Sequence, residues 1–308
     1  MPVAHARPFL KWAGGKSQLL PALLDRLPGE VRTGEVTRYV EPFVGGGAVF
    51  FHLNQAFAFD ECHIVDANDE LILAYRVVQR DVEALIDRLA AIRDEYLPLS
   101  EEERKAYFYR VRESFNRDRE GIHFDRYSRT WVRRAAQLVF LNRTCFNGLF
   151  RVNAEGAFNV PFGRQKNPTI VNEALLRADA AALEKTRIHR GDFTIAEPFI
   201  DDRTFVYFDP PYRPLSSTSS FTAYARRGFT DADQHRLAAF FRDCHRKGAF
   251  CMLSNSDPRN GDPGDQFFDT LYAGFAIERV PAKRMINSNG AARGEITEII
   301  VDTYRMDR

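Results

Sequence analysis

The tetrapeptide Asp209-Pro210-Pro211-Tyr212 brings a carboxylate, two rigid residues and an aromatic ring together within four positions. Proline fixes φ and lacks a backbone N–H, so its carbonyl is presented as a hydrogen-bond acceptor. Asp209 and the Pro210 carbonyl are therefore suited to accept both hydrogens of an exocyclic amine, while the Tyr212 ring stacks on the planar base that carries the amine. The alternative is a loop that only ends a strand. The apolar strand expected over Thr204–Phe208, directly before the tetrapeptide, favours the chemical interpretation.

A strand followed by a glycine-rich turn is expected over Val40–Gly47. Glycine lets the backbone approach a nucleotide-like ligand closely. Gly45 and Gly47 fit the spacing of the dinucleotide fingerprint, but Phe50 stands where its third glycine belongs, so a simple strand-to-helix turn is the alternative. Asp66 follows about twenty residues later at the end of a second strand, where an acid that bonds ribose hydroxyls is expected in such folds. The alternative is that Asp66 caps the next helix. Together these features favour a cofactor that contains adenosine.

The segment Lys11–Ser17 ends in Gly15-Lys16-Ser17, as a phosphate-binding loop does. That loop also requires a glycine where Leu10 stands, and no convincing strand precedes it, so the sequence argues against it. Trp12 and Lys16 are instead suited to pack over an aliphatic chain and to bind a carboxylate.

The middle of the chain is basic although the whole chain is nearly neutral. Lys plus Arg is 43 and Asp plus Glu is 42, so the net charge is +1 and a polycationic chain is excluded. Between Arg104 and Arg134 there are ten basic and four acidic residues, and between Arg129 and Pro168 there are seven and one. Within this part, Asn142–Arg151 mixes cations, amides and aromatic rings. Arginine can bond guanine in the major groove and an apolar ring can wedge into the base stack, whereas the alternative is a solvated basic face.

Composition and spacing argue against several other classes of protein. The chain has 308 residues, of which 44% are hydrophobic and 28% charged, as in an ordinary globular protein. No apolar run approaches the ~20 residues of a membrane span, and no secretory signal is expected. Four scattered cysteines give neither a zinc site nor a disulfide framework, which favours a reducing, intracellular setting. The histidines His5, His52 and His63 lack ligand spacing, so no metal is expected, and no G-x-S-x-G elbow indicates a serine hydrolase.

The elements that must position these residues alternate between helix and strand at both ends of the chain. Helices are expected over Lys16–Leu27, Ala48–Asn54, Asp69–Gln79, Asn172–Leu183 and Asp231–Cys244, and strands over Arg38–Phe43, His63–Asp66, Thr204–Phe208, Ala249–Leu253 and Glu295–Tyr304. Between them, the charged part from about Asp81 to Phe140 is expected to be helical, and Asn142–Pro168 to form loops with a hairpin. The sequence predicts one α/β domain split by a basic helical insertion.

In this order the motifs resemble the Dam-type DNA adenine-N6 methyltransferases, the D12 class with the motif order of the alpha group. The resemblance spans nearly the whole chain and rests on the blocks Phe9–Lys16, Glu41–Gly47, Asp66–Asn68, Leu141–Arg143, Phe146–Leu149, Phe158–Arg164, Asp209–Tyr212, Phe221–Tyr224, Ser254–Asp257 and Ser288–Gly290. It implies a Rossmann-like class I S-adenosyl-L-methionine-dependent methyltransferase sheet with an inserted, mainly helical DNA-recognition domain. The catalytic domain would comprise residues 1–80 and 169–308, and the target-recognition domain residues 81–168.

The resemblance also implies roles for individual residues. The catalytic residues, which would hold an adenine flipped out of the duplex, are Asp209, Pro210, Pro211 and Tyr212. The residues that would bind S-adenosyl-L-methionine are Trp12, Lys16, Glu41, Phe43, Gly45, Gly47, Asp66, Asp192, Phe193 and Asp209. The residues that would bind double-stranded DNA are Lys11, Arg143, Phe146, Asn147, Leu149, Arg151, Asn159, Pro161, Arg164, Ser288 and Asn289.

The best-known members of this family methylate the adenine of GATC. The residues that match the positions they use to read this site are Lys11, Leu149, Arg151 and Pro161. Phe146 stands where relatives often carry a tyrosine that wedges into the base stack. Thr144-Cys145 and Gln165 differ from close relatives, which leaves the outer base pair open.

Two alternatives differ from this function. An amine on RNA adenine or a protein glutamine would also suit the tetrapeptide, although the glutamine-modifying type normally has Asn at the position of Asp209. A DNA-binding module without activity is the non-enzymatic alternative, and the intact Asp66 and Asp209–Tyr212 argue against it. The resemblance implies a cytoplasmic, nucleoid-associated protein of a prokaryote or a phage. A monomer suffices to act on one base, and a dimer on DNA stays open, as does the choice between a solitary regulator and half of a restriction-modification system.

Overall fold

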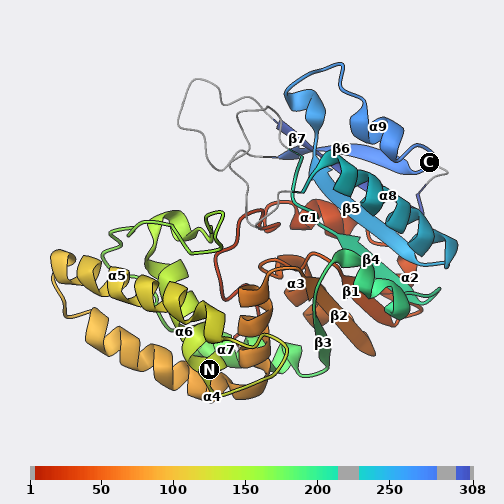
Figure 1. Cartoon of the computed structure of the whole chain (residues 1–308). Helices are drawn as coiled ribbons and strands as arrows, with labels where there is room; N and C mark the ends of the chain where they lie inside the picture. Colours follow the sequence, from red (N-terminus) through yellow and green to blue (C-terminus); the bar gives the residue numbers. More distant parts are fainter. Residues whose placement is uncertain (1–3, 214–228, 283–295, 306–308) are drawn as a thin grey trace.

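A seven-stranded sheet forms the centre of the computed structural model, which describes residues 4–213, 229–282 and 296–305 (Figure 1). The strands are β1 (Arg38–Glu41), β2 (Glu61–Asp66), β3 (Thr186–Arg190), β4 (Thr204–Phe208), β5 (Phe250–Ser256), β6 (Ala276–Ala282) and β7 (Ile296–Asp302). Their order is β3-β2-β1-β4-β5-β7-β6; β1 to β5 are parallel, and β7 is antiparallel to both of its neighbours. The expected α/β class is confirmed. The order reverses between β1 and β4, and ligands bind at the carboxyl ends of strands at such a switch point.

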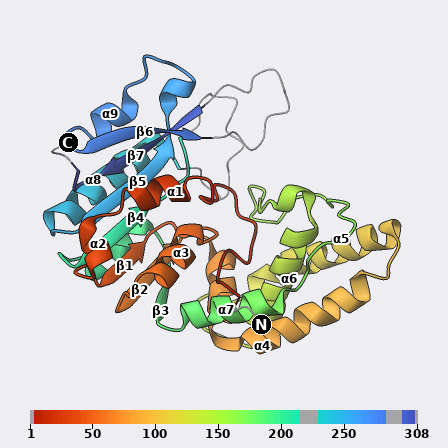
Figure 2. The same cartoon turned by 180° about the vertical axis from the view of Figure 1, so that it is seen from behind.

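Helices cover both faces of this sheet. The helices of the described residues are α1 (Leu20–Asp25), α2 (Gly29–Thr33), α3 (Ala48–Ala56), α4 (Asp69–Tyr96), α5 (Glu101–Arg117), α6 (Thr130–Thr144), α7 (Glu173–Leu183), α8 (Asp231–Arg246) and α9 (Phe267–Leu271). Successive side chains of a strand point to opposite faces. Phe205 and Tyr207 of β4 accordingly join one core with α1, α3, α4 and α7, while Val206 and Phe208 join another with α8 and α9. The helix α8 lies in front of the sheet in Figure 1, and α1 to α3 lie in front in Figure 2.

A helical part made of α4, α5 and α6 stands beside the sheet (Figure 1). α4 is kinked at Asp81 (φ −139°, ψ 45°), the residue at which the sequence places the start of the insertion. It packs on α6 and α7 as well as on β2 and β3, so the helical part and the sheet share one core. Glu70 of α4 accepts two hydrogen bonds, at 2.9 and 2.5 Å, from the buried Arg134 of α6. This paired charge fixes α6 against the helix that follows β2.

Several elements differ from what the sequence predicts, among them the short helices α2 and α9, which the sequence does not predict. The helix expected from Lys16 begins only at Leu20, because Pro21 fits the first turn of a helix and would clash further inside it. β3 and β6 were not expected, and both lie at the edges of the sheet. Their sequences, T-R-I-H-R and A-I-E-R-V-P-A, mix polar and apolar residues too evenly to give the continuous apolar run of a central strand.

Within residues 4–213, 229–282 and 296–305, no helix is long and apolar enough to cross a membrane. In the same part of the chain, His, Cys, Asp and Glu side chains form no group that could hold a metal ion.

Candidate active site

Asp209 follows β4 directly and lies at the switch point of the sheet. Its Oδ1 is 2.7 Å from Lys16 Nζ and accepts a hydrogen bond from Ser254 Oγ at 3.4 Å. The side chain is 17% exposed, so the carboxylate lies at a wall of the site and is not enclosed by the core. Burial raises the pKa of Asp209 to about 6, against the opposing effect of the Lys16 ammonium. The carboxyl is therefore ionised at neutral pH and can accept hydrogen bonds.

The two prolines after Asp209 differ in how their carbonyls are used. Gln234 Nε2 donates to the Pro211 carbonyl at 3.3 Å. Among the described residues, no donor bonds the Pro210 carbonyl, so it can accept from a ligand. Tyr212 is held by its hydroxyl, which donates to Glu298 Oε2 of β7 at 2.6 Å. Burial raises the pKa of Tyr212 well above its ordinary value, so this hydroxyl stays protonated and donates.

Four residues that support this tetrapeptide have no role predicted from the sequence, namely Gln234, Glu298, Ser254 and Tyr207. Glu298 fixes the Tyr212 hydroxyl, and Ser254 lies between Asp209 and the Tyr207 hydroxyl, which is 2.7 Å from Ser254 Oγ. Ser254 begins one of the blocks on which the family resemblance rests, so a signal for it existed. Glu298 carries no such signal, because a charged residue in an antiparallel strand is typical of a solvent-facing position.

The glycine-rich turn and Asp66 lie side by side at the ends of β1 and β2. The N–H of Gly45 donates to Asp66 Oδ2 at 3.1 Å, and the N–H of Asn68 donates to Oδ1 at 2.8 Å. Gly47 has φ +74°, and a Cβ there would lie 2.5 Å from the Tyr75 hydroxyl, so only glycine fits. The N-cap of α4 is Asn68, which accepts from the N–H of Leu71, so the interpretation of Asp66 as a helix cap is wrong. Each Asp66 oxygen retains a second lone pair for a ligand hydroxyl.

Aromatic rings stand next to this turn. The rings of Phe43 and Phe193 are 5.4 Å apart, and Phe229 meets Phe43 edge-on at 5.8 Å. Asp192 precedes Phe193 and is exposed; its Oδ1 accepts from Arg236 at 3.0 Å. Phe193, one of the residues predicted to bind the cofactor, thus lies next to Phe43, while the side chain of Asp192 forms an ion pair with Arg236.

Trp12 and Lys16, which are predicted to bind the cofactor, also reach the site. A Cβ on Gly45 would lie 3.1 Å from Trp12 Cδ1, so the indole packs on the glycine turn. Lys16 is 6% exposed; its ammonium donates to the Gly14 carbonyl at 2.6 Å and lies 4.5 Å from the centre of the Tyr212 ring. Lys16 therefore stands between the predicted cofactor site and the tetrapeptide.

Glu41 ends β1 beneath these residues and is buried. The Tyr39 hydroxyl donates to its Oε2 at 2.7 Å. Burial raises the pKa of Glu41 well above its ordinary value, so the group favours the neutral form. Glu41, which is predicted to bind the cofactor, is thus 2% exposed and already bonded to Tyr39.

Side chains from several helices hold the N-terminal segment, which runs between the sheet and the helical part (Figures 1 and 2). Gln55 bonds both backbone groups of Ala6 at 2.8 Å. The backbone N–H of Arg7 donates to Asp179 Oδ1 at 2.9 Å. Further along, side chains of α6 bond the backbone of Phe9 and Lys11. The segment is thus anchored residue by residue before it reaches Trp12.

The predicted DNA-contacting residues around α6 gather on one loop. Phe146, in the 3₁₀ turn Phe146–Gly148, is 52% exposed, which is unusual for a phenylalanine. Asn147 is exposed with φ +55°. Arg151 Nε donates to Asn159 Oδ1 at 2.8 Å, which orients its guanidinium. Leu149 is half-buried beside them.

The other predicted DNA-contacting residues differ in how accessible they are to a duplex. Arg143 donates to the Phe9 carbonyl at 2.6 Å, and burial lowers its pKa. Its guanidinium is therefore already bonded inside the protein. Arg164 is exposed and lies 3.7 Å from Glu101, while Pro161 is exposed. Ser288 and Asn289 lie outside the described residues.

Part of the basic surplus of the middle segment is neutralised internally. Arg134 pairs with Glu70, Arg119 with Asp69, and Arg133 with Asp118. The excess of basic residues counted along the sequence therefore overstates the charge available to a partner.

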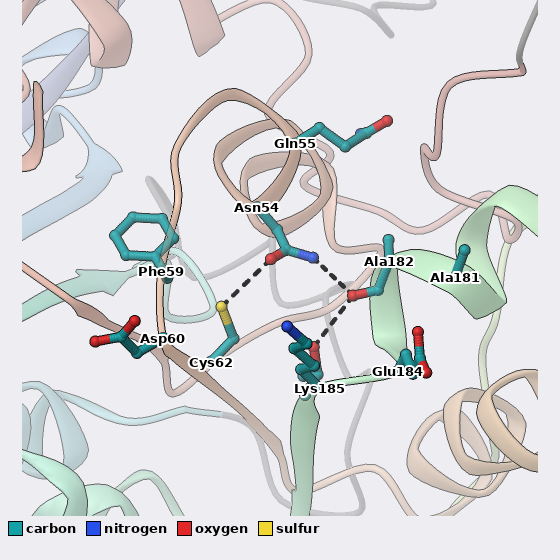
Figure 3. A pocket seen from close by; sticks show the side chains of 10 residues that line it. Asn54, Gln55, Phe59, Asp60, Cys62, Ala181, Ala182, Glu184 and Lys185 are labelled. Atoms are coloured by element: carbon teal, nitrogen blue, oxygen red, sulfur yellow. Dashed lines mark hydrogen bonds between the residues drawn. The ribbon is translucent and has the colours of Figure 1, made fainter. Parts of the chain in front are cut away.

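A cavity of about 210 Å³ opens at the other end of the sheet, where β2 and β3 begin (Figure 3). Its residues are Asn54, Gln55, Phe59, Asp60, Cys62, Ala181, Ala182, Glu184, Lys185 and Thr186. Asn54 bridges across it, accepting from Cys62 Sγ at 3.5 Å and donating to the Ala182 carbonyl at 2.7 Å. None of the predicted site residues lines it, and the Asp66 end of β2 faces away from it.

The residues at the switch point fit the cofactor that the sequence predicts. Asp66 offers lone pairs to ribose hydroxyls, the Gly47 turn has no room for a Cβ, and Phe43 offers a ring to a purine. The strand order, with one antiparallel strand between β5 and β6, is that of a class I S-adenosyl-L-methionine-dependent methyltransferase.

The family follows from comparison with known proteins. Residues 12–286 match the D12 class N6 adenine-specific DNA methyltransferases, and the chain belongs to this family. It is 48% identical over 301 residues to the type II methyltransferase M.MjaIII of Methanocaldococcus jannaschii, which covers 97% of this chain and 100% of that one. It is 41% identical to the type II methyltransferase M1.LlaDCHI of Lactococcus lactis subsp. cremoris, over 97% and 96% of the two chains. A DNA adenine methylase of Escherichia coli K12 is 33% identical over 96% and 94%.

Proposed function

We propose that this adenine-N6 DNA methyltransferase transfers a methyl group from S-adenosyl-L-methionine to adenine in duplex DNA, within GATC. The observation that carries the proposal is the position of Asp209, whose carboxylate stands at the switch point with Lys16 at 2.7 Å and the Pro210 carbonyl beside it. The site thus offers two acceptors for one amine next to residues that fit an adenosine.

The N6 amine of adenine is a poor nucleophile because its lone pair is delocalised into the ring. Hydrogen bonds from the amine to Asp209 and to the Pro210 carbonyl would favour a pyramidal nitrogen and localise that pair. The bound cofactor supplies a methyl group already activated on a sulfonium. The protein therefore contributes mainly orientation and electrostatics for an in-line displacement. Asp209 would receive the proton that the amine loses.

The target adenine must leave the base stack to reach this site. Flipping costs a few kcal/mol, and stacking of the extruded base on Tyr212 offsets part of that cost. The exposed Phe146 is suited to fill the gap in the duplex. We therefore assign target recognition to residues 81–168 and catalysis to residues 1–80 and 169–308.

The choice of GATC rests on the residues that match the positions with which members of the family read this sequence, namely Lys11, Leu149, Arg151 and Pro161.

The higher identity to two type II methyltransferases, 48% and 41% against 33% for the DNA adenine methylase, supports a place in a restriction-modification system.

The test is transfer of tritiated methyl groups to plasmid DNA, followed by digestion with enzymes that read methylated and unmethylated GATC. The proposal predicts label on adenine and protection of GATC. Label on adenine without protection at GATC would refute GATC as the target sequence, but it would not refute adenine methylation. Parallel reactions with single-stranded DNA and RNA separate the alternative substrates, and label on RNA adenine in preference to duplex would overturn the proposal.

A further inference from the structure

Asn142, in the last turn of α6, joins two segments that are far apart in the sequence. Its Oδ1 accepts from the N–H of Lys11 at 2.8 Å, and its Nδ2 donates to the carbonyls of Lys11 and Gly148, both at 2.8 Å. The side chain is 1% exposed. Both amide hydrogens are used, so Asn142 clamps the backbone of the N-terminal segment to the loop that carries Phe146.

The same two segments touch at two further points. Gly148 has φ +65°, and a Cβ there would lie 2.3 Å from Lys11 Cδ, so the Lys11 side chain packs directly on the Gly148 backbone. The ring of Trp12 stacks on that of Phe150, with centroids 5.2 Å apart and planes at 19°. We call these contacts of Lys11 and Trp12 with Asn142, Gly148 and Phe150 the junction.

The two sides of the junction lead to different sites. From Lys11 the chain continues through Trp12, which packs on the Gly45 turn, to Lys16, which pairs with Asp209. On the other side, the loop presents the exposed Phe146 outward. A movement of this loop on the duplex must therefore either break the bond from Asn142 to the Gly148 carbonyl and the packing of Gly148 and Phe150 on Lys11 and Trp12, or shift the cofactor-side segment with it.

We propose that Asn142 is a positioning residue that makes binding of the methyl donor and binding of duplex DNA cooperative; this inference rests on the proposed function. Cooperativity between two sites is reciprocal and typically amounts to about 5- to 150-fold in affinity. If Asn142 only stabilised the fold, its substitution would lower the stability of the protein and leave this coupling unchanged.

The chain offers a matched control in Asn116 of α5. Its Nδ2 donates to the Phe158 carbonyl at 3.0 Å and its Oδ1 accepts from the Phe158 N–H at 2.8 Å, so it clasps a backbone as Asn142 does. Asn116 bonds neither Lys11 nor Trp12, and its partner Phe158 reaches the junction only through its ring, whose centroid lies 5.8 Å from that of Phe150. Asn116→Leu therefore removes an equivalent clasp without touching the cofactor-side segment.

The experiment measures binding of S-adenosyl-L-homocysteine by calorimetry, with and without a short duplex that the wild type methylates. We expect the duplex to tighten that binding at least fivefold in the wild type and in Asn116→Leu, and to leave it within twofold in Asn142→Leu. If Asn142→Leu does not fold, Asn142→Ser is used, because its smaller side chain admits water to the unpaired backbone groups.

Three results would overturn the inference. They are a wild type that binds both ligands without mutual effect, a folded Asn142 variant that keeps the full coupling, and an Asn116→Leu variant that loses as much. Failure of the wild type to bind S-adenosyl-L-homocysteine at all would instead overturn the proposed function, and the inference with it.

Discussion

The Lys16 ammonium lies 2.7 Å from Asp209 Oδ1 and 4.5 Å from the centre of the Tyr212 ring. One buried cation thus contacts both ends of the tetrapeptide that would receive the base. Since Lys16 belongs to the segment that also packs Trp12 on the glycine turn, the two candidate sites share a wall. This arrangement makes the charge of Asp209 the feature on which activity should depend most.

The first prediction concerns the pH dependence of methyl transfer. The pKa of Asp209 is raised to about 6, so its carboxylate is charged above this pH and protonated below it. Protonation removes an acceptor for the amine and the partner of Lys16. We expect the single-turnover rate with saturating duplex to fall as the pH drops through about 6. A rate that is flat between pH 5 and pH 7, after correction for folding, would contradict this assignment.

The second prediction concerns stability and Asp179. This carboxyl is fully buried, and burial raises its pKa from 3.8 to about 8. Between these values the folded chain holds a proton that the unfolded chain has released, so this group lowers the free energy of unfolding as the pH rises. Asp179→Asn mimics the protonated form. We expect its melting temperature to exceed that of the wild type by more at pH 8.5 than at pH 6.

The control for Asp179 is Asp202→Asn, a change at an exposed position. Its effect on the melting temperature should be the same at both pH values. An Asp179→Asn effect that is equally independent of pH would show that Asp179 is ionised in the folded chain throughout.

The third prediction separates base reading from phosphate binding at Arg151. Asn159 fixes Nε of this side chain at 2.8 Å, which leaves the outer edge of the guanidinium for a base. Arg151→Ala should relax discrimination at one base pair of the site by about 1–3 kcal/mol. Methylation of duplexes that differ at one position measures this loss.

Lys166→Ala, which removes an exposed cation outside the loop Phe146–Arg151, is the comparison for Arg151. This variant should bind all duplexes more weakly to a similar degree, or bind them as the wild type does. If Arg151→Ala also weakened all sequences equally, Arg151 would contact a phosphate.

The parts of the molecule that the sequence predicts well depend on local patterns. The strand Thr204–Phe208 is confirmed to the residue, and α7 begins after Asn172, which caps it. The positions of Gly45 and Asp66 follow from strand ends in a parallel sheet, and the structure places them in contact. Their binding roles stay predictions.

Other features depend on contacts between distant segments, which composition and periodicity do not encode. Glu298 bonds Tyr212 only because β7 inserts between β5 and β6. Arg143 has the residue type of a DNA contact, yet its position on α6 directs it to the Phe9 carbonyl. The polar edge strands β3 and β6 escape a search for apolar runs for the same reason, since neighbouring elements decide their pairing.

The most direct test of the central claim is methyl transfer by Asp209→Ala, measured beside its binding of duplex DNA and S-adenosyl-L-homocysteine. Loss of the carboxylate removes an acceptor of the adenine amine but leaves the predicted DNA-contacting residues of the loop Phe146–Arg151 in place. We predict that methyl transfer is abolished while duplex binding stays close to that of the wild type. Retained turnover in Asp209→Ala would contradict the account.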